Sequence, residues 1–139
     1  MEKQINISSS EQMIQFGQSL SKQLKGGDII YLNGDLGAGK TTLTKGIIKG
    51  LGYDGNIKSP TFTLVESYCP SEIDIHHFDL YRIADPEELE WMGIRDYFND
   101  DSIVLIEWPE KGEGFLPEAN IEINISYLEE GRHIEIFHN

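Results

Sequence analysis

Apolar residues recur at two different spacings along the chain, and the first stretch has the spacing of a helix. Residues 10–25 carry apolar side chains three or four positions apart, which puts them on one helical face. These side chains are Met13, Phe16, Leu20 and Leu24. The serines at 8–10 offer a helix cap, and the glycines at 26–27 offer a stop. The pattern predicts a helix of about four turns between them.

A strand and a second helix are predicted on either side of a glycine-rich segment. Residues 28–33 are rich in apolar and β-branched side chains, which is typical of a short buried strand. Residues 42–51 have an apolar helical face, and Gly52 follows where a helix is expected to stop. The face consists of Leu43, Ile47, Ile48 and Leu51. The order strand, loop, helix follows from this pattern.

Segments with strand character occupy most of the second half. They are residues 61–68, 73–78, 102–108, 120–127 and 132–138. A short turn separates the first two, which predicts an antiparallel hairpin. The third is the most apolar run and predicts a central strand, and the Asp85-Pro86 pair predicts a helix start before it. The fold class is therefore α/β, with a mixed sheet that has a parallel core and antiparallel additions.

Residues 34–41 read Gly-Asp-Leu-Gly-Ala-Gly-Lys-Thr, a complete G-x-x-x-x-G-K-[ST] phosphate-binding loop (P-loop). Its glycines let backbone N–H groups close around phosphate oxygens, and the next helix points its positive end at them. We expect the amides of Gly37, Ala38 and Gly39 to hold phosphates. In this motif Lys40 reaches the β- and γ-phosphates, and the Thr41 hydroxyl binds Mg²⁺. The length of 139 residues predicts one domain, 1–139. The P-loop and the elements around it predict that this is a P-loop ATPase domain with the NTPase-like three-layer sandwich.

Nucleotide hydrolysis also needs a carboxylate near Mg²⁺ and a group that orients the attacking water. In open α/β sheets such groups lie at the carboxyl ends of core strands. Glu107 ends the apolar run 103–106 and Asp79 ends the segment 73–78, so we predict both as catalytic. Glu107 could instead be an exposed strand-end acid, and Asp79 a local cap or a partner of Arg82. The sequence leaves open which of the two acids binds the metal.

Four nearby residues have alternative interpretations. Thr61 follows Pro60 in a segment where P-loop proteins often carry a switch, although a turn fixed by the proline is the simpler structure. Trp108 directly follows Glu107; it either covers the site or stacks on a base, or else it packs in the core. We interpret His77 as a structural histidine, with a general base as the alternative. His76 should point to the opposite face and lie at the surface.

The nucleotide is expected to be ATP, since no guanine-reading Asn-Lys-x-Asp or Thr-Lys-x-Asp sequence occurs. Kinases of small molecules clamp phosphate with several arginines, whereas this chain has only Arg82, Arg95 and Arg132. We expect low intrinsic ATPase activity that a partner stimulates, because a supplied arginine is worth ~10³–10⁵ in rate. A small-molecule kinase and a nucleotide-gated binding module with negligible turnover remain the alternatives.

Charge and cysteine content limit the partners. The net charge is −13, and residues 66–122 hold sixteen acids against three basic residues. Such a surface repels a phosphate backbone, so direct nucleic-acid binding is not expected. The acidic segment is either a solvated face or a docking surface for a basic protein. A lone cysteine, Cys69, and the lack of a membrane-length apolar run or signal peptide predict a cytoplasmic protein without membrane contact.

Four strings together resemble the TsaE (YjeE/YdiB) family, the P-loop ATPases of tRNA N6-threonylcarbamoyladenosine biosynthesis. They are residues 34–42, Ser-Pro-Thr-Phe-Thr at 59–63, His-Phe-Asp-Leu-Tyr-Arg at 77–82, and Ile-Glu-Trp-Pro-Glu at 106–110. The resemblance extends from the first helix to Gly131 and Arg132.

This resemblance implies partnership with the TsaB–TsaD complex, which installs threonylcarbamoyl on adenosine 37 of tRNAs reading codons that begin with A. The nucleotide cycle of the ATPase would support repeated turnover of that complex. Glu107 resembles the second metal-site residue of the family, and Asp79 a catalytic or switch acid. Further positions that the resemblance implies for the nucleotide site are Thr42, Trp108, Ser10 and Arg132, the last two beside the adenine.

Overall fold

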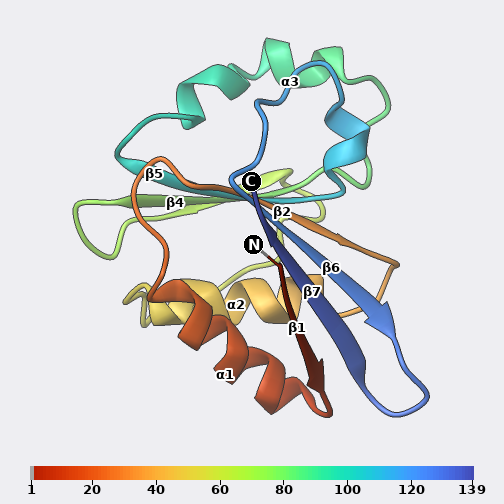
Figure 1. Ribbon diagram of the computed structural model, residues 1–139. Coiled ribbons are helices and arrows are strands. Elements are labelled where there is room, and N and C mark those ends of the chain that lie inside the picture. The colour runs from red at the N-terminus through yellow and green to blue at the C-terminus, as the bar shows by residue number, and fades with distance from the viewer. Residues whose placement is uncertain (1) are drawn as a thin grey trace.

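A single seven-stranded sheet runs through the computed structural model, which describes residues 2–139 (Figure 1). Its strand order is β1-β7-β6-β2-β5-β4-β3. The strands are β1 (Glu2–Ile7), β2 (Ile29–Gly34), β3 (Val65–Tyr68), β4 (Asp74–Asp79), β5 (Ser102–Glu107), β6 (Ile121–Tyr127) and β7 (Arg132–His138). β2, β4, β5 and β6 run parallel, whereas β1, β3 and β7 pair antiparallel with their neighbours. The predicted mixed sheet is confirmed.

Helices cover both faces of this sheet, which gives the predicted three layers (Figure 1). On one face lie α1 (Ser10–Ser21) and α2 (Lys40–Gly50). On the other lie α3 (Glu87–Trp91) and two short 3-10 helices, η1 (Ile94–Tyr97) and η2 (Pro109–Gly112). A separate cluster of buried apolar side chains fills the space on each side. None of the helices in residues 2–139 has the length and apolar character that a membrane span requires.

The helices α1 and α2 approach each other closely because glycines lie at their contact. A Cβ on Gly17 would lie 2.6 Å from the carbonyl oxygen of Leu43, and one on Gly46 would lie 2.3 Å from that of Ile14. Past the end of α2, Gly52 has φ +105° and donates to the carbonyl of Lys49, as the predicted helix stop requires. This packing fixes the helix that begins at the P-loop.

Two predicted elements are shorter in the structure. The first helix ends at Ser21 instead of reaching Leu24, because the chain turns there through bonds such as Leu24 N–H to Ser21 C=O, 3.1 Å. The strand predicted over 61–68 begins only at Val65. Leu64 adopts a left-handed conformation with φ +74°, and its N–H bonds the carbonyl of Pro60 at 2.7 Å. Residues 61–64 are therefore a turn, and the hairpin of β3 with β4 follows it.

The first strand was not predicted. Ile5 and Ile7 are the apolar side chains in β1, which is too weak a pattern to distinguish a strand from a polar terminus. Within the described strands, β1 lies at the edge of the sheet and pairs with β7. It matters for the site because Ile7 leads directly into the serines that precede α1.

Candidate active site

The P-loop occupies the turn between β2 and α2, so the predicted strand–loop–helix order is confirmed. Gly37 has φ +80° and Gly39 has φ +112°, a backbone region that favours glycine. A Cβ on Gly37 would come 3.0 Å from the Tyr127 hydroxyl, and one on Gly39 would come 3.0 Å from Met13 Cε. The backbone conformation and the close neighbours both favour glycine at these positions, as the P-loop motif requires.

Lys40 begins α2 with its side chain buried beside the loop, where the residue is 4% exposed. Its Nζ donates to the carbonyl of Gly34 and lies 3.5 Å from the centroid of the Trp108 ring. Burial lowers the pKa of Lys40, while the nearby carboxylates of Glu107 and Asp79 act in the opposite direction. None of the ion pairs within residues 2–139 includes Lys40. A buried ammonium without a paired carboxylate suits an anionic ligand.

Thr41 and Glu107 meet where α2 begins and β5 ends. Thr41 Oγ1 lies 3.1 Å from Oε2 and 3.3 Å from Oε1 of Glu107, which is buried. A hydroxyl has one proton, so donating it to the carboxylate leaves its lone pairs free for a cation. One hydroxyl and one carboxylate fit Mg²⁺, which keeps several waters and takes few protein ligands. Across residues 2–139 no group of three or more His, Cys, Asp or Glu forms a metal cage.

His77 is a second partner of Glu107. Its Nε2 lies 2.6 Å from Glu107 Oε2, and both side chains are almost completely buried. His76 points to the other face, as predicted, but it is half-buried instead of lying at the surface. The Ser67 hydroxyl lies 2.7 Å from His76 Nδ1, and the ring of Tyr97 packs against it edge-on. Burial lowers the pKa of His76.

Asp79 lies directly beside Glu107 in the register of β4 with β5. Its Oδ2 accepts a hydrogen bond from Thr61 Oγ1 at 3.2 Å, and its Oδ1 accepts the Tyr81 N–H at 3.0 Å. The local cap considered for Asp79 is thus present. The ion pairs of the described chain do not join Asp79 to Arg82, whose guanidinium instead lies 4.6 Å from the centroid of the Phe62 ring.

These predicted residues converge on one cavity of about 220 Å³ at the carboxyl ends of β4 and β5. Among its lining residues are Gly37, Gly39, Lys40, Thr41, Thr42, Thr61, Asp79, Glu107 and Trp108. Trp108 also packs against the apolar cluster under α3, so it lies between this cavity and the core. The chain thus brings a cation, two carboxylates and three threonine hydroxyls to one cavity, a set suited to binding and hydrolysing a phosphoanhydride or a phosphate ester.

A second cavity, of about 290 Å³, lies on the other side of the loop. Its lining includes the two residues predicted beside a base, Ser10 and Arg132, together with Ala38. Arg132 Nε donates to the carbonyl of Ala38 at 3.1 Å, and its guanidinium lies 4.3 Å from the centroid of the Tyr127 ring. Ser10, Arg132 and the loop therefore line the same cavity.

Tyr127 was not identified from the sequence. Its hydroxyl donates to the carbonyl of Leu36 at 2.8 Å and so braces the P-loop from the end of β6. β6 reaches the loop because it runs parallel to β2. The only available signal was its place at the carboxyl end of a late strand, and the sequence did not show which strand would neighbour β2.

Comparisons with known proteins agree with this architecture. The sequence profile of "Threonylcarbamoyl adenosine biosynthesis protein TsaE" matches residues 7–134. A tRNA threonylcarbamoyladenosine biosynthesis protein TsaE from Haemophilus influenzae is 59% identical over 129 residues, or 89% of this chain and 82% of its own. The protein of the same name from Rickettsia felis is 40% identical, covering 92% of this chain and 75% of its own.

The crystal structure of YdiB from Bacillus subtilis has a TM-score of 0.81 to this structure at 29% identity, covering 99% of this chain and 86% of that one. The match in fold and the matches in sequence extend over nearly the whole length described. The resemblance seen in the four sequence strings is thereby confirmed, and the chain belongs to the TsaE family, whose members take part in tRNA threonylcarbamoyladenosine biosynthesis.

Proposed function

We propose that this chain is an ATP hydrolase that binds Mg-ATP in its P-loop and supports threonylcarbamoyl modification of adenosine 37 in tRNAs reading codons that begin with A. The family assignment supports the pathway. The observation that carries the hydrolase activity is the convergence on one cavity of the buried Lys40, the Thr41–Glu107 contact and the Thr61–Asp79 contact.

We assign the metal to Thr41 and Glu107, because Thr41 is the motif hydroxyl and its Oγ1 lies 3.1 Å from the Glu107 carboxylate. When bound, Mg²⁺ would neutralise charge on the phosphate oxygens. Asp79 then orients the attacking water, and its hydrogen bond with Thr61 links it to the proposed switch. Lys40 and the loop amides hold phosphates, while Ser10, Thr42 and Arg132 form the proposed nucleoside side of the site.

The positions of the three arginines are the reason why we expect hydrolysis by the isolated chain to be slow. Arg132 bonds the loop carbonyl of Ala38, Arg95 lies 3.3 Å from Glu90, and Arg82 stacks on Phe62. None of these three lines the cavity that holds Lys40 and the two carboxylates. We therefore propose that the TsaB–TsaD complex is the partner that accelerates hydrolysis. One domain over 1–139 and a cytoplasmic location belong to the same proposal.

Labelled ATP tests this function directly. With ATP labelled on the γ-phosphate, we expect slow release of phosphate to water by the chain alone and faster release with TsaB and TsaD present. Lys40→Ala should abolish release, whereas Lys49→Ala, an exposed lysine on the same helix, should leave it unchanged. Label that appears on a small acceptor without any partner would identify a kinase instead. A Lys40→Ala protein that still supports modification would favour a binding module without turnover.

A further inference from the structure

We propose that His77 is a positioning residue that fixes the carboxylate of Glu107 through a hydrogen bond from its Nε2–H, and thereby sets the affinity of the site for Mg²⁺. This inference rests on the metal role proposed for Glu107. It assigns His77 neither to contact with the nucleotide nor to proton transfer.

The geometry of neighbouring strands creates this contact. β4 and β5 run parallel, and in their register His77 lies opposite Leu105, two residues before Glu107. The side chains of residues two apart share a face of the sheet. The ring of His77 therefore extends along that face to Glu107, where Nε2 comes within 2.6 Å of Oε2. The side chains are 1% and 4% exposed, so water hardly competes for either group.

The other ring nitrogen identifies the tautomer. Nδ1 of His77 is buried and has no hydrogen-bond partner among residues 2–139. An N–H at this position would be a buried donor without an acceptor, so the hydrogen belongs on Nε2 and is donated to Glu107. Here the ring serves one group, the carboxylate that faces the site.

The two oxygens of Glu107 are thereby differentiated. Oε2 accepts the 2.6 Å bond from His77 and also lies 3.1 Å from Thr41 Oγ1, whereas Oε1 has only that hydroxyl nearby among the hydrogen-bonding groups of residues 2–139, at 3.3 Å. Without the ring, Thr41 would be the one described side chain left to orient this buried carboxylate. Outer partners that orient metal ligands in this way typically change metal affinity about 10–100-fold when removed.

Three variants test the role of His77. His77→Leu removes the donor, His77→Gln keeps an N–H on a shorter side chain, and His76→Gln is the matched control on the opposite face. ATP affinity is measured with Mg²⁺ titrated in and, separately, with the metal chelated. We expect His77→Leu to raise the Mg²⁺ concentration for half-saturation about 10–100-fold while metal-free ATP affinity stays unchanged. His77→Gln should recover much of the loss, and His76→Gln should resemble the natural chain.

An unchanged Mg²⁺ requirement in folded His77→Leu, or an equal loss of metal-free binding, would overturn the inference. Glu107→Ala separates this failure from that of the proposed function. If Glu107→Ala also leaves the Mg²⁺ requirement unchanged, the metal role of Glu107 is wrong. If it alone changes the requirement, only the role of His77 is wrong. Should His77→Leu not fold, ¹⁵N NMR of the natural chain decides: hydrogen on Nε2 supports the positioning role, and hydrogen on Nδ1 overturns it.

Discussion

Trp108 combines an unusual backbone conformation with a contact to Lys40 in the candidate site. It follows Glu107 with φ +58°, a conformation that bulky residues rarely adopt. Such local strain persists where the surroundings hold it, and it is common at functional sites. Here Pro109 begins η2 directly afterwards, and the indole ring of Trp108 lies against the ammonium of Lys40. The strained turn thus orients an aromatic face toward the residue proposed to hold phosphate.

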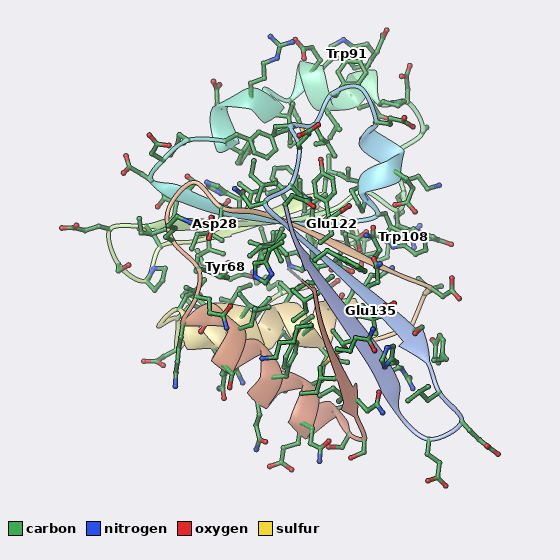
Figure 2. The ribbon with its side chains drawn as sticks, in the orientation of Figure 1. Asp28, Tyr68, Trp91, Trp108, Glu122 and Glu135 are labelled. Carbon is green, nitrogen blue, oxygen red and sulfur yellow. The ribbon has the colours of Figure 1, made fainter. Side chains whose placement is uncertain are left out.

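Fluorescence can report this contact, because the chain has two tryptophans and they lie in different environments. Trp91 is 76% exposed on α3, and Figure 2 shows it well away from Trp108. In a Trp91→Phe variant, ATP should change the emission of Trp108, since phosphate alters the field of Lys40 at the ring. The matched variant Trp108→Phe retains Trp91 alone and should respond little. A full response in that second variant would contradict the assignment.

A second prediction at this scale concerns pH. Burial lowers the pKa of His76 below its usual value of about 6.5, although Asp74 opposes the shift. The unfolded chain then binds more protons than the folded chain below about pH 6.5, so the free energy of unfolding should fall as pH drops through that value. Urea denaturation between pH 5 and 8 should show a shallower fall for His76→Gln. Parallel curves for the two proteins would rule out this residue as the cause.

At the scale of elements, the crossing of α1 and α2 is the contact that is most sensitive to added volume. Gly46→Ala would direct a methyl group at the backbone of Ile14 on α1, 2.3 Å from its carbonyl oxygen. Alanine favours a helix by about 1 kcal/mol over glycine, but overpacking against backbone has little room to relax. We expect a net loss of about 1–3 kcal/mol in the free energy of unfolding, measured in urea. Lys49→Ala, exposed on the same helix, should change it by less than about 0.5 kcal/mol.

Some helices and strands could be predicted from the sequence, whereas others could not. α2 and β5 were predicted within two residues because one has a full apolar face and the other is buried along its whole length. The edge strand β1 has few apolar positions, so its existence depends on pairing with β7, which no local pattern reveals. At the site, too, the local sequence does not show which strands are neighbours. The motif predicted Lys40 and Thr41, whereas the choice of Glu107 as the partner of Thr41 depends on how β2, β4 and β5 are ordered.

At the scale of the whole molecule, the balance of acidic and basic residues differs between the first and second parts of the sequence. Residues 1–65 hold seven lysines and five acids, and they include α1 and α2, which cover one face of the sheet, together with the P-loop. The sixteen acids of residues 66–122 include exposed carboxylates of α3 and η1 on the opposite layer. The P-loop therefore belongs to the slightly basic part of the sequence, although Asp79 and Glu107 of the acidic part also line its cavity. The remaining carboxylates of the acidic part present a negative field to any larger partner.

This separation predicts that the isolated chain does not bind tRNA, even though the family acts in tRNA modification. Phosphate contacts supply most non-specific affinity for nucleic acids, and a chain with net charge −13 has few basic side chains to offer. Electrophoretic mobility shift at physiological salt should show no saturable complex. Charge reversal at exposed Glu87, Glu90 and Asp96 supplies the positive control, because added lysines should create weak binding that falls steeply with salt. Saturable binding of tRNA by the natural chain would mean that this face of the molecule does not control its contact with RNA.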